Sequence, residues 1–292
     1  MHIGVSSRSF HAPLYAGSLH LADVPLAAYR LGLRFVELND VFLTPSAPGR
    51  LARWFGSKPE APVGPDYGRK SLMRMRQSRL RSGTRLACWT VETDLTVIAP
   101  EARRAQREYV GTAIEAARFL GAPILRMTLG GSVDDRAGVS RAIDLMRSVA
   151  PAAIASGVRL AIENHGGLSS EPGVLEEIVA AYQSGSGPSP VGVCLDFSHF
   201  DPGGHVSGVT RLAPLAIHVH AHTRAFDDRG EETTLDYAAS LAALRAAGFD
   251  GVICIEYAGD SDPRKGILKS KALIEKYAAD DLDGGERWRM MR

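Results

Sequence analysis

Residues 101–129, EARRAQREYVGTAIEAARFLGAPILRMTL, contain the unit from which the fold of this chain can be predicted. Within residues 101–120, apolar or small side chains recur at the spacing of one helix face, at Ala105, Tyr109, Ala113, Ala116 and Leu120. Gly121 then ends the predicted helix, because glycine readily adopts the left-handed conformation found after helix C-termini. The apolar run PILRMTL, residues 123–129, is typical of a buried strand. The stretch therefore predicts a helix, a glycine stop and a strand.

The same unit recurs along the chain. Glycine separates a predicted helix from a strand at Gly32, Gly157 and Gly248, the last after a helix at 235–247. The eight strand candidates are 2–7 (HIGVSS), 33–39 (LRFVELN), 85–91 (RLACWTV), 123–129 (PILRMTL), 158–164 (VRLAIEN), 191–197 (VGVCLDF), 215–221 (LAIHVHA) and 251–257 (GVICIEY). Strict alternation of apolar strands with helices indicates a parallel sheet covered by helices.

Eight such repeats favour closure into a single-domain (β/α)8 (TIM) barrel over an open doubly wound sheet. No GxGxxG motif follows the first strand, so the dinucleotide-binding fingerprint of the open-sheet alternative is absent from the sequence. We assign residues 1–279 to the barrel. Residues 44–69, rich in Pro and Gly, follow the second strand and are predicted to be a loop insertion on the catalytic face. Residues 280–292 are predicted to be a polar tail, either frayed or contributing to a homo-oligomer.

Composition excludes several classes of function. The 292 residues are 45% hydrophobic and 23% charged, which is typical of a soluble globular protein. The net charge of +1 offers no overall field for nucleic acid or a membrane surface, and no apolar stretch approaches 18 residues. Three cysteines without a CxxC pair are predicted to be buried free thiols in a reducing cytoplasm. The first residues, MHIGVSSRSF, lack the pattern of a secretory signal, and we expect a cytoplasmic protein.

One local charge cluster departs from this balance. Arginines occur at positions 69, 74, 76, 79, 81 and 85. A solvated helix face is the favoured interpretation, and a site for an anion or a partner remains the alternative.

The ends of the last four predicted strands carry ionisable side chains. Strand five ends in Glu163-Asn164-His165, strand six in Asp196-Phe197-Ser198-His199, and strand eight in Glu256-Tyr257, while strand seven contains His218, His220 and His222. Strand residues alternate between faces, so the three histidines of strand seven share one face. In a barrel all strand ends meet at one mouth, and converging carboxylates there require a cation to offset their repulsion. The mixed oxygen and nitrogen ligands suit one divalent ion, which could be Mn²⁺, Mg²⁺, Co²⁺ or Zn²⁺, and we take Mn²⁺ as the first candidate.

The sequence also resembles the xylose isomerase-like TIM-barrel superfamily, which includes sugar isomerases and epimerases, inosose and dehydroshikimate dehydratases and apurinic endonucleases. The resemblance rests on IENHGG (162–167), LDFSHF (195–200), IHVHAHT (217–223) and LRAAGFDGVICIEYAG (244–259), with HIGVSS, FVELND and DPRKGILKSKALI (262–274). It implies a metal site made of Glu163, Asp196, His220 and Glu256.

The ketose epimerase branch of that superfamily implies substrate-binding roles. Its Asp-x-x-His element corresponds to Asp196 and His199, with the histidine touching the substrate, and an arginine after strand seven makes Arg224 a candidate. Arg224 lies four residues beyond His220, whereas the branch has a spacing of six. Ser169 stands where that branch has a further Glu, which argues against a simple ketose 3-epimerase. His222 stands where many relatives have Lys. We also assign His165 and Trp54 to the substrate.

The predicted chemistry is proton abstraction next to a carbonyl of a small carbohydrate or keto acid, through an enediolate, with Glu163 and Glu256 as base and acid. Return of the proton would give an epimer or an isomer, and loss of a β-leaving group would make the protein a lyase. An apurinic endonuclease would need further histidine ligands from early strands, yet no histidine lies between His20 and His165. A barrel used only for binding is the non-enzymatic alternative.

Overall fold

The computed structural model describes residues 1–43, 67–183, 189–200 and 203–278, which form one closed barrel of eight parallel strands. Each strand pairs in parallel with the next along the chain, and the last pairs with the first. The predicted (β/α)8 barrel and its eight strands are therefore confirmed. The strands are β1 (His2–Ser6), β2 (Phe35–Asn39), β3 (Arg85–Val91), β4 (Ile124–Thr128), β5 (Arg159–Glu163), β6 (Val191–Asp196), β7 (Ala216–Thr223) and β8 (Val252–Tyr257).

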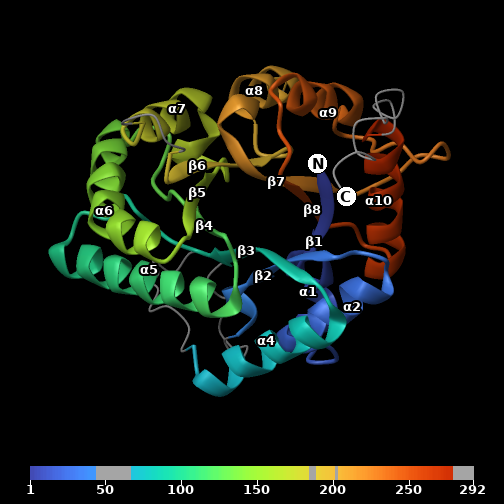
Figure 1. Cartoon of the computed structure of the whole chain (residues 1–292). Helices are drawn as coiled ribbons and strands as arrows, with labels where there is room; N and C mark the ends of the chain where they lie inside the picture. Colours follow the sequence, from blue (N-terminus) through green and yellow to red (C-terminus); the bar gives the residue numbers. More distant parts are fainter. Residues whose placement is uncertain (44–66, 184–188, 201–202, 279–292) are drawn as a thin grey trace, which may run out of the picture.

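Helices form the outer ring around these strands (Figure 1). They are α1 (His11–Tyr15), α2 (Val24–Arg30), α4 (Arg69–Ser82), α5 (Pro100–Leu120), α6 (Arg136–Ala155), α7 (Pro172–Ala180), α8 (His205–Leu212), α9 (Tyr237–Ala246) and α10 (Pro263–Ala278), with short 3-10 turns η1 (Ser7–Phe10), η2 (Leu21–Asp23), η3 (Asp40–Phe42), η4 (Gly167–Ser170) and η5 (Ala213–Leu215). α5 ends as its sequence predicts, because Gly121 adopts a φ of 77° and its N–H bonds back to the last turn. No helix in this part of the chain has both the length and the apolar character needed to cross a membrane.

The strands have two different faces. On β5, Leu160 and Ile162 belong to the buried apolar core, whereas Glu163 points into the barrel, where it contacts His220 of β7. Side chains that point outward therefore hold the helices against the sheet. Those that point inward at the carboxyl ends of the strands form a polar layer, and this layer is the candidate site.

The two ends of the predicted insertion lie together beyond β2. Both the Tyr67 and the Tyr109 hydroxyls donate to Asp40 Oδ2, at 2.6 and 2.5 Å, so η3 and the segment just before α4 are tied to α5. Trp54 and nearly all of segment 44–69 lie outside the described residues. The same is true of the tail at 280–292. The placement of the insertion at the mouth of the barrel thus stays a prediction.

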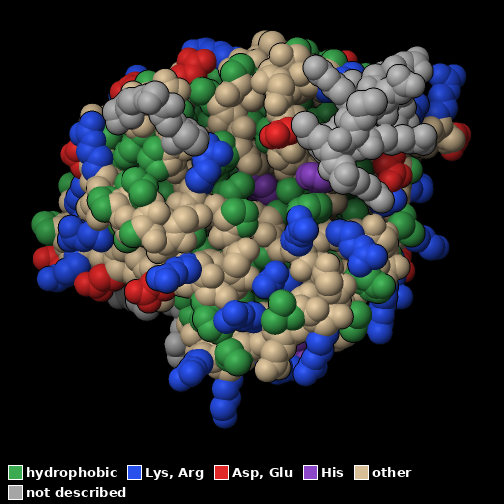
Figure 2. Space-filling view, viewed as in Figure 1, with side chains coloured by type: hydrophobic (Ala, Val, Ile, Leu, Met, Phe, Trp, Pro, Cys, Tyr) green, Lys and Arg blue, Asp and Glu red, His purple; other side chains and the backbone are tan. Residues whose placement is uncertain are grey.

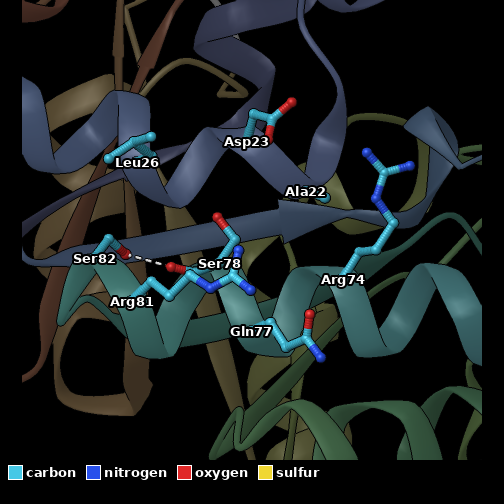
Figure 3. A pocket seen from close by; sticks show the side chains of 8 residues that line it. All are labelled: Ala22, Asp23, Leu26, Arg74, Gln77, Ser78, Arg81 and Ser82. Atoms are coloured by element: carbon cyan, nitrogen blue, oxygen red, sulfur yellow. Dashed lines mark hydrogen bonds between the residues drawn. The ribbon is translucent and has the colours of Figure 1, made fainter.

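The arginine cluster at 69–85 lies on α4 and just after it, at the outer surface. Arg74, Arg76 and Arg81 are exposed, and no cation of α4 forms an ion pair with another described residue. Lys and Arg side chains gather over this part of the face seen in Figure 2. A groove of about 310 Å³ between α2 and α4 is lined by Leu26, Arg74 and Arg81 among others (Figure 3). It lies outside the barrel and contains none of the predicted site residues.

Candidate metal centre at the carboxyl end of the barrel

Neighbouring strands bring the four predicted metal ligands to one place. In the strand register Asp196 of β6 is level with His220 of β7, and His222 of β7 is level with Glu256 of β8. Glu163 is the last residue of β5. All four side chains therefore enter the barrel at its carboxyl end, where active sites of this architecture lie.

The centre of this group is one nitrogen of a buried imidazole. His220 Nδ1 lies 2.5 Å from Glu163 Oε1, 3.8 Å from Glu256 Oε1 and 3.9 Å from Asp196 Oδ2. Possible ligand atoms of Glu163, Asp196 and His220 all lie within 4.8 Å of one another. Three carboxylates thus converge on a single ring nitrogen.

Asp196 has the features expected of a metal ligand. Its Oδ1 accepts hydrogen bonds from the backbone N–H and the hydroxyl of Ser198, at 2.6 and 2.7 Å, whereas its fully buried Oδ2 has no hydrogen-bond partner among the described residues. Burial alone would raise the pKa of Asp196, but the neighbouring imidazoles of His222, His199 and His220 lower it, so the carboxylate is charged. An unpaired buried carboxylate oxygen is costly, and a cation would satisfy it. The oxygen and nitrogen donors present fit a divalent ion.

The opposite side of the His220 ring is held by Glu37 of β2, a residue that was not among the predicted site residues. His220 Nε2 lies 2.8 Å and His218 Nε2 lies 2.6 Å from Glu37 Oε2, and Ser6 donates to Glu37 Oε1 at 2.9 Å. Because Nε2–H donates to a carboxylate, Nδ1 of His220 is left facing the three acids. This carboxylate–imidazole arrangement is the usual means of orienting a histidine ligand.

Glu37 and His220 form a buried ion pair. Burial opposes the imidazolium of His220, yet the nearby carboxylates of Glu37 and Glu256 raise its pKa well above the usual value. Burial likewise opposes ionisation of Glu37, but His220 and His218 lower its pKa. A proton on His220 therefore occupies, in the metal-free chain, the place that a metal ion would take, and metal binding would release it.

The predicted substrate-binding residues surround this centre. His165 Nδ1 lies 2.9 Å from Glu163 Oε2, and the His165 and His199 rings are 4.6 Å apart. His199 Nε2 lies 3.9 Å from Asp196 Oδ2, so His199 could also approach a metal there. Arg224 Nε donates to His222 Nε2 at 3.4 Å, which places the Arg224 side chain beside the site. His165 and His199 are about one-third exposed, as groups that meet a ligand should be.

Three further charged residues lie on the other side of Glu163. Arg126 of β4, only 4% exposed, forms an ion pair with Glu163, and its Nε has no hydrogen-bond partner among the described residues. Glu92, just beyond β3, lies 3.6 Å from both Arg126 and Arg8. A charged residue inside an apolar strand is the signal that could have identified Arg126, because burial of an unpaired guanidinium is unfavourable.

The three cysteines are free and buried, as predicted. Burial raises the pKa of Cys88, Cys194 and Cys254 above the value of a free thiol. They are therefore neutral at pH 7 and unsuited to nucleophilic catalysis.

Comparisons with known proteins agree with this fold. A family model described as a xylose isomerase-like TIM barrel matches residues 26–277. No curated protein sequence matches the chain. A structure of the IOLI protein with a bound zinc atom superposes with a TM-score of 0.70 at 13% identity, covering 96% of this chain and 99% of that one.

Two other solved structures are similar over the same extent. The 3-keto-D-glucoside 4-epimerase of E. coli has a TM-score of 0.67 at 14% identity, covering 94% of this chain and 99% of that one. A probable 3-DHS dehydratase of Bacillus anthracis has a TM-score of 0.67 at 14% identity, covering 94% and 98%. At these identities the similarity establishes the barrel fold.

Proposed function

Because the chain belongs to the xylose isomerase-like TIM barrel family, we propose that it is an enzyme, a divalent-metal-dependent isomerase or epimerase of sugars or keto-sugars. The observation that carries the proposal is the convergence of Glu163, Asp196 and Glu256 on Nδ1 of His220. A set of three carboxylates and one imidazole at a barrel mouth is a site for a Lewis acid.

The metal would be held by Glu163, Asp196, His220 and Glu256, with Mn²⁺ the first candidate and Mg²⁺, Co²⁺ and Zn²⁺ the alternatives. When bound, it would polarise a substrate carbonyl and offset the negative charge that develops on oxygen. Glu37 would keep the His220 ring in its liganding orientation through the 2.8 Å hydrogen bond to Nε2.

The chain itself supplies a base and an acid. Glu163 and Glu256 both approach His220 Nδ1 but come from different strands, β5 and β8, so they can flank a substrate carbon from two sides. We assign proton abstraction next to the carbonyl to one and proton return to the other, through an enediolate. Return to the opposite face epimerises the carbon, and return to the adjacent carbon isomerises the sugar. His165 and His199 would contact the substrate, because their side chains are about one-third exposed and adjoin Glu163 and Asp196.

A lyase is the second candidate. The observation that favours it is the pair of adjoining imidazoles, His165 and His199, whose ring centres are 4.6 Å apart beside Glu163 and Asp196. Burial lowers the pKa of both imidazoles, so they are neutral at pH 7, and His165 could protonate a β-leaving group after taking over the proton that Glu163 removes from the substrate. One structural neighbour is described as a probable dehydratase.

Solvent exchange tests both candidates. The Mn²⁺-loaded protein would be incubated in D2O with a panel of ketoses, keto-inositols and 3-keto-glycosides, and products would be analysed by mass spectrometry and NMR. We expect deuterium on the carbon next to the carbonyl for at least one compound. An unsaturated product would indicate the lyase. Turnover with neither exchange nor a primary isotope effect would contradict proton abstraction altogether.

A further inference from the structure

Glu92 is a carboxylate whose side-chain contacts with other described residues are two long ion pairs, to Arg8 and Arg126. It follows β3 at the rim of the barrel, with its side chain 40% exposed, and its Oε1 lies 3.6 Å from Arg8 and from Arg126. These contacts keep the group ionised, because burial raises its pKa but Arg126 and Arg8 lower it further. At 3.6 Å, however, neither arginine makes a good hydrogen bond, so both carboxylate oxygens can still accept bonds from a ligand.

Glu92 borders a cavity of about 220 Å³ beside the candidate metal centre. The cavity lies between the ends of β3, β4 and β5 and is lined by Glu92, Thr128, Gly130, Gly167 and His165 among others. His165 connects it to the reacting carboxylate, since its Nδ1 lies 2.9 Å from Glu163 Oε2. A ligand held at the metal can therefore extend past His165 into this space. At ~30 Å³ per water the cavity holds about seven waters, which is close to the size of one sugar ring.

The floor of the cavity is backbone. Gly130 has a φ of +76°, and a Cβ there would lie 2.2 Å from the Asp94 carboxylate, while a Cβ at Gly167 would lie 2.5 Å from the carbonyl oxygen of Gly131. Neither position can carry a side chain, so the loops after β4 and β5 approach each other closely and leave the space above them free. The hydroxyls of Thr93 and Thr128 each form hydrogen bonds with the backbone of the other residue, so these bonds already use their hydroxyl protons.

The charged residues around the cavity favour an uncharged ligand over an anionic one. On this side of the site Arg8 and Arg126 are balanced by Glu92 and Glu163, and the Asp94 carboxylate beside Gly130 adds a further negative charge, so the described groups offer no excess positive charge. An anionic group in the cavity would stand against the Glu92 carboxylate and would be repelled. Hydroxyl groups would instead donate to the carboxylate oxygens of Glu92, which retain acceptor capacity beside the two long arginine contacts.

We infer that this cavity binds an uncharged polyhydroxyl ring attached to the reacting sugar, with Glu92 accepting hydrogen bonds from two neighbouring hydroxyls. The substrate class is then a neutral keto-glycoside or keto-disaccharide, rather than a monosaccharide or an acidic sugar in this subsite. The inference rests on the proposed function and names the substrate class of that same site. Glu92 is in this view a specificity residue, since a site built to bond hydroxyls rejects groups that cannot donate to it.

Equilibrium binding to the Mn²⁺-loaded full chain tests the inference with unreactive sugars. Isothermal titration calorimetry would compare glucose, cellobiose and cellobiouronic acid, the last of which replaces one hydroxymethyl group of cellobiose by a carboxylate. We expect cellobiose to bind at least tenfold more tightly than glucose and at least tenfold more tightly than cellobiouronic acid.

The variant Glu92→Gln removes the charge and keeps the shape. In Glu92→Gln the ratio of the dissociation constants of cellobiouronic acid and cellobiose should fall at least tenfold. In Glu101→Gln, a change at the exposed start of α5, this ratio should stay the same. Equal binding of the two disaccharides to the unmodified chain, or an unchanged preference in Glu92→Gln, would overturn the inference. Absence of deuterium exchange on every keto-sugar would instead count against the proposed function, because the binding preference does not depend on turnover.

Discussion

Replacing Glu37 by glutamine should weaken metal binding although Glu37 is not expected to touch the metal. The change keeps the size of the side chain and removes its charge. Glu37 Oε2 bonds both His220 Nε2, at 2.8 Å, and His218 Nε2, at 2.6 Å. Glutamine has only one acceptor oxygen, so either the two imidazoles or Ser6 must face an amide N–H. In both orientations at least one bond to a charged acceptor is lost.

The expected magnitude follows from burial. Glu37 and His218 are fully buried, and no water can replace the lost acceptor. A hydrogen bond to a charged group contributes about 1.5–3 kcal/mol. At about 1.4 kcal/mol per factor of ten this corresponds to a roughly 10- to 100-fold weaker metal site, which is the usual range for a carboxylate that orients a histidine ligand.

Metal affinity would be measured by competition with a chelating dye for Mn²⁺ and Zn²⁺. Glu177→Gln is the matched control, because Glu177 makes an exposed ion pair with Arg136 on the outer helices. Circular dichroism and thermal unfolding would establish that both variants are folded. If folded Glu37→Gln bound Mn²⁺ within twofold of the unmodified chain, the proposed orientation of His220 by Glu37 would be wrong.

Three further results are expected. Arg126→Met removes one of the two buried cations beside Glu163, the other being protonated His220, and should destabilise the metal-free chain by about 3 kcal/mol in urea unfolding. The loss should shrink when Mn²⁺ is bound, and equal losses with and without Mn²⁺ would contradict the idea that Arg126 and the metal ion both neutralise Glu163. The pKa of the buried Asp40 is raised by burial from 3.8 to about 6, so the folded chain holds this proton more tightly than the unfolded chain. The unmodified chain should therefore lose about 2 to 2.5 kcal/mol relative to Asp40→Asn as the pH rises from about 4 to 7, and parallel stability curves would refute this. His199→Asn should keep one metal ion per chain by elemental analysis while kcat/KM on the exchanging sugar falls about 100-fold; loss of the ion would make His199 a ligand instead.

The fold could be predicted from the sequence because each barrel unit is local. The helix at 100–120, its glycine stop and the strand at 124–128 depend on periodicity within some thirty residues, and the structure reproduces them within one or two residues. The closed order of strands then follows from the number of repeats, since eight βα units close a barrel.

The candidate site could be predicted only in part, and the missing residues share a cause. Glu37 and Arg126 each occur as a single charge in an apolar strand, and their partners are far away in sequence. His220 lies 183 residues from Glu37, so the pair is visible only once the barrel is closed. The strand-end acids of β5, β6 and β8 were identifiable because they recur at one position of a repeat. Glu37 and Arg126, which hold these site residues in place, do not recur at an equivalent position of the repeat.

The two carboxylates proposed as base and acid differ in their access to water, and this difference can be measured. Glu163 is 1% exposed and is covered by Arg126 and His165, whereas Glu256 is 13% exposed. A proton taken by Glu163 should therefore be returned to the same carbon more often than it exchanges, while Glu256 should equilibrate with solvent and deliver deuterium. If Glu163 is the base, product formed in D2O at low conversion should carry deuterium at the inverted carbon and recovered substrate should carry almost none. Deuterium in the recovered substrate at a rate close to turnover would mean that Glu256, the less buried of the two carboxylates, takes the proton, and the two roles would be reversed.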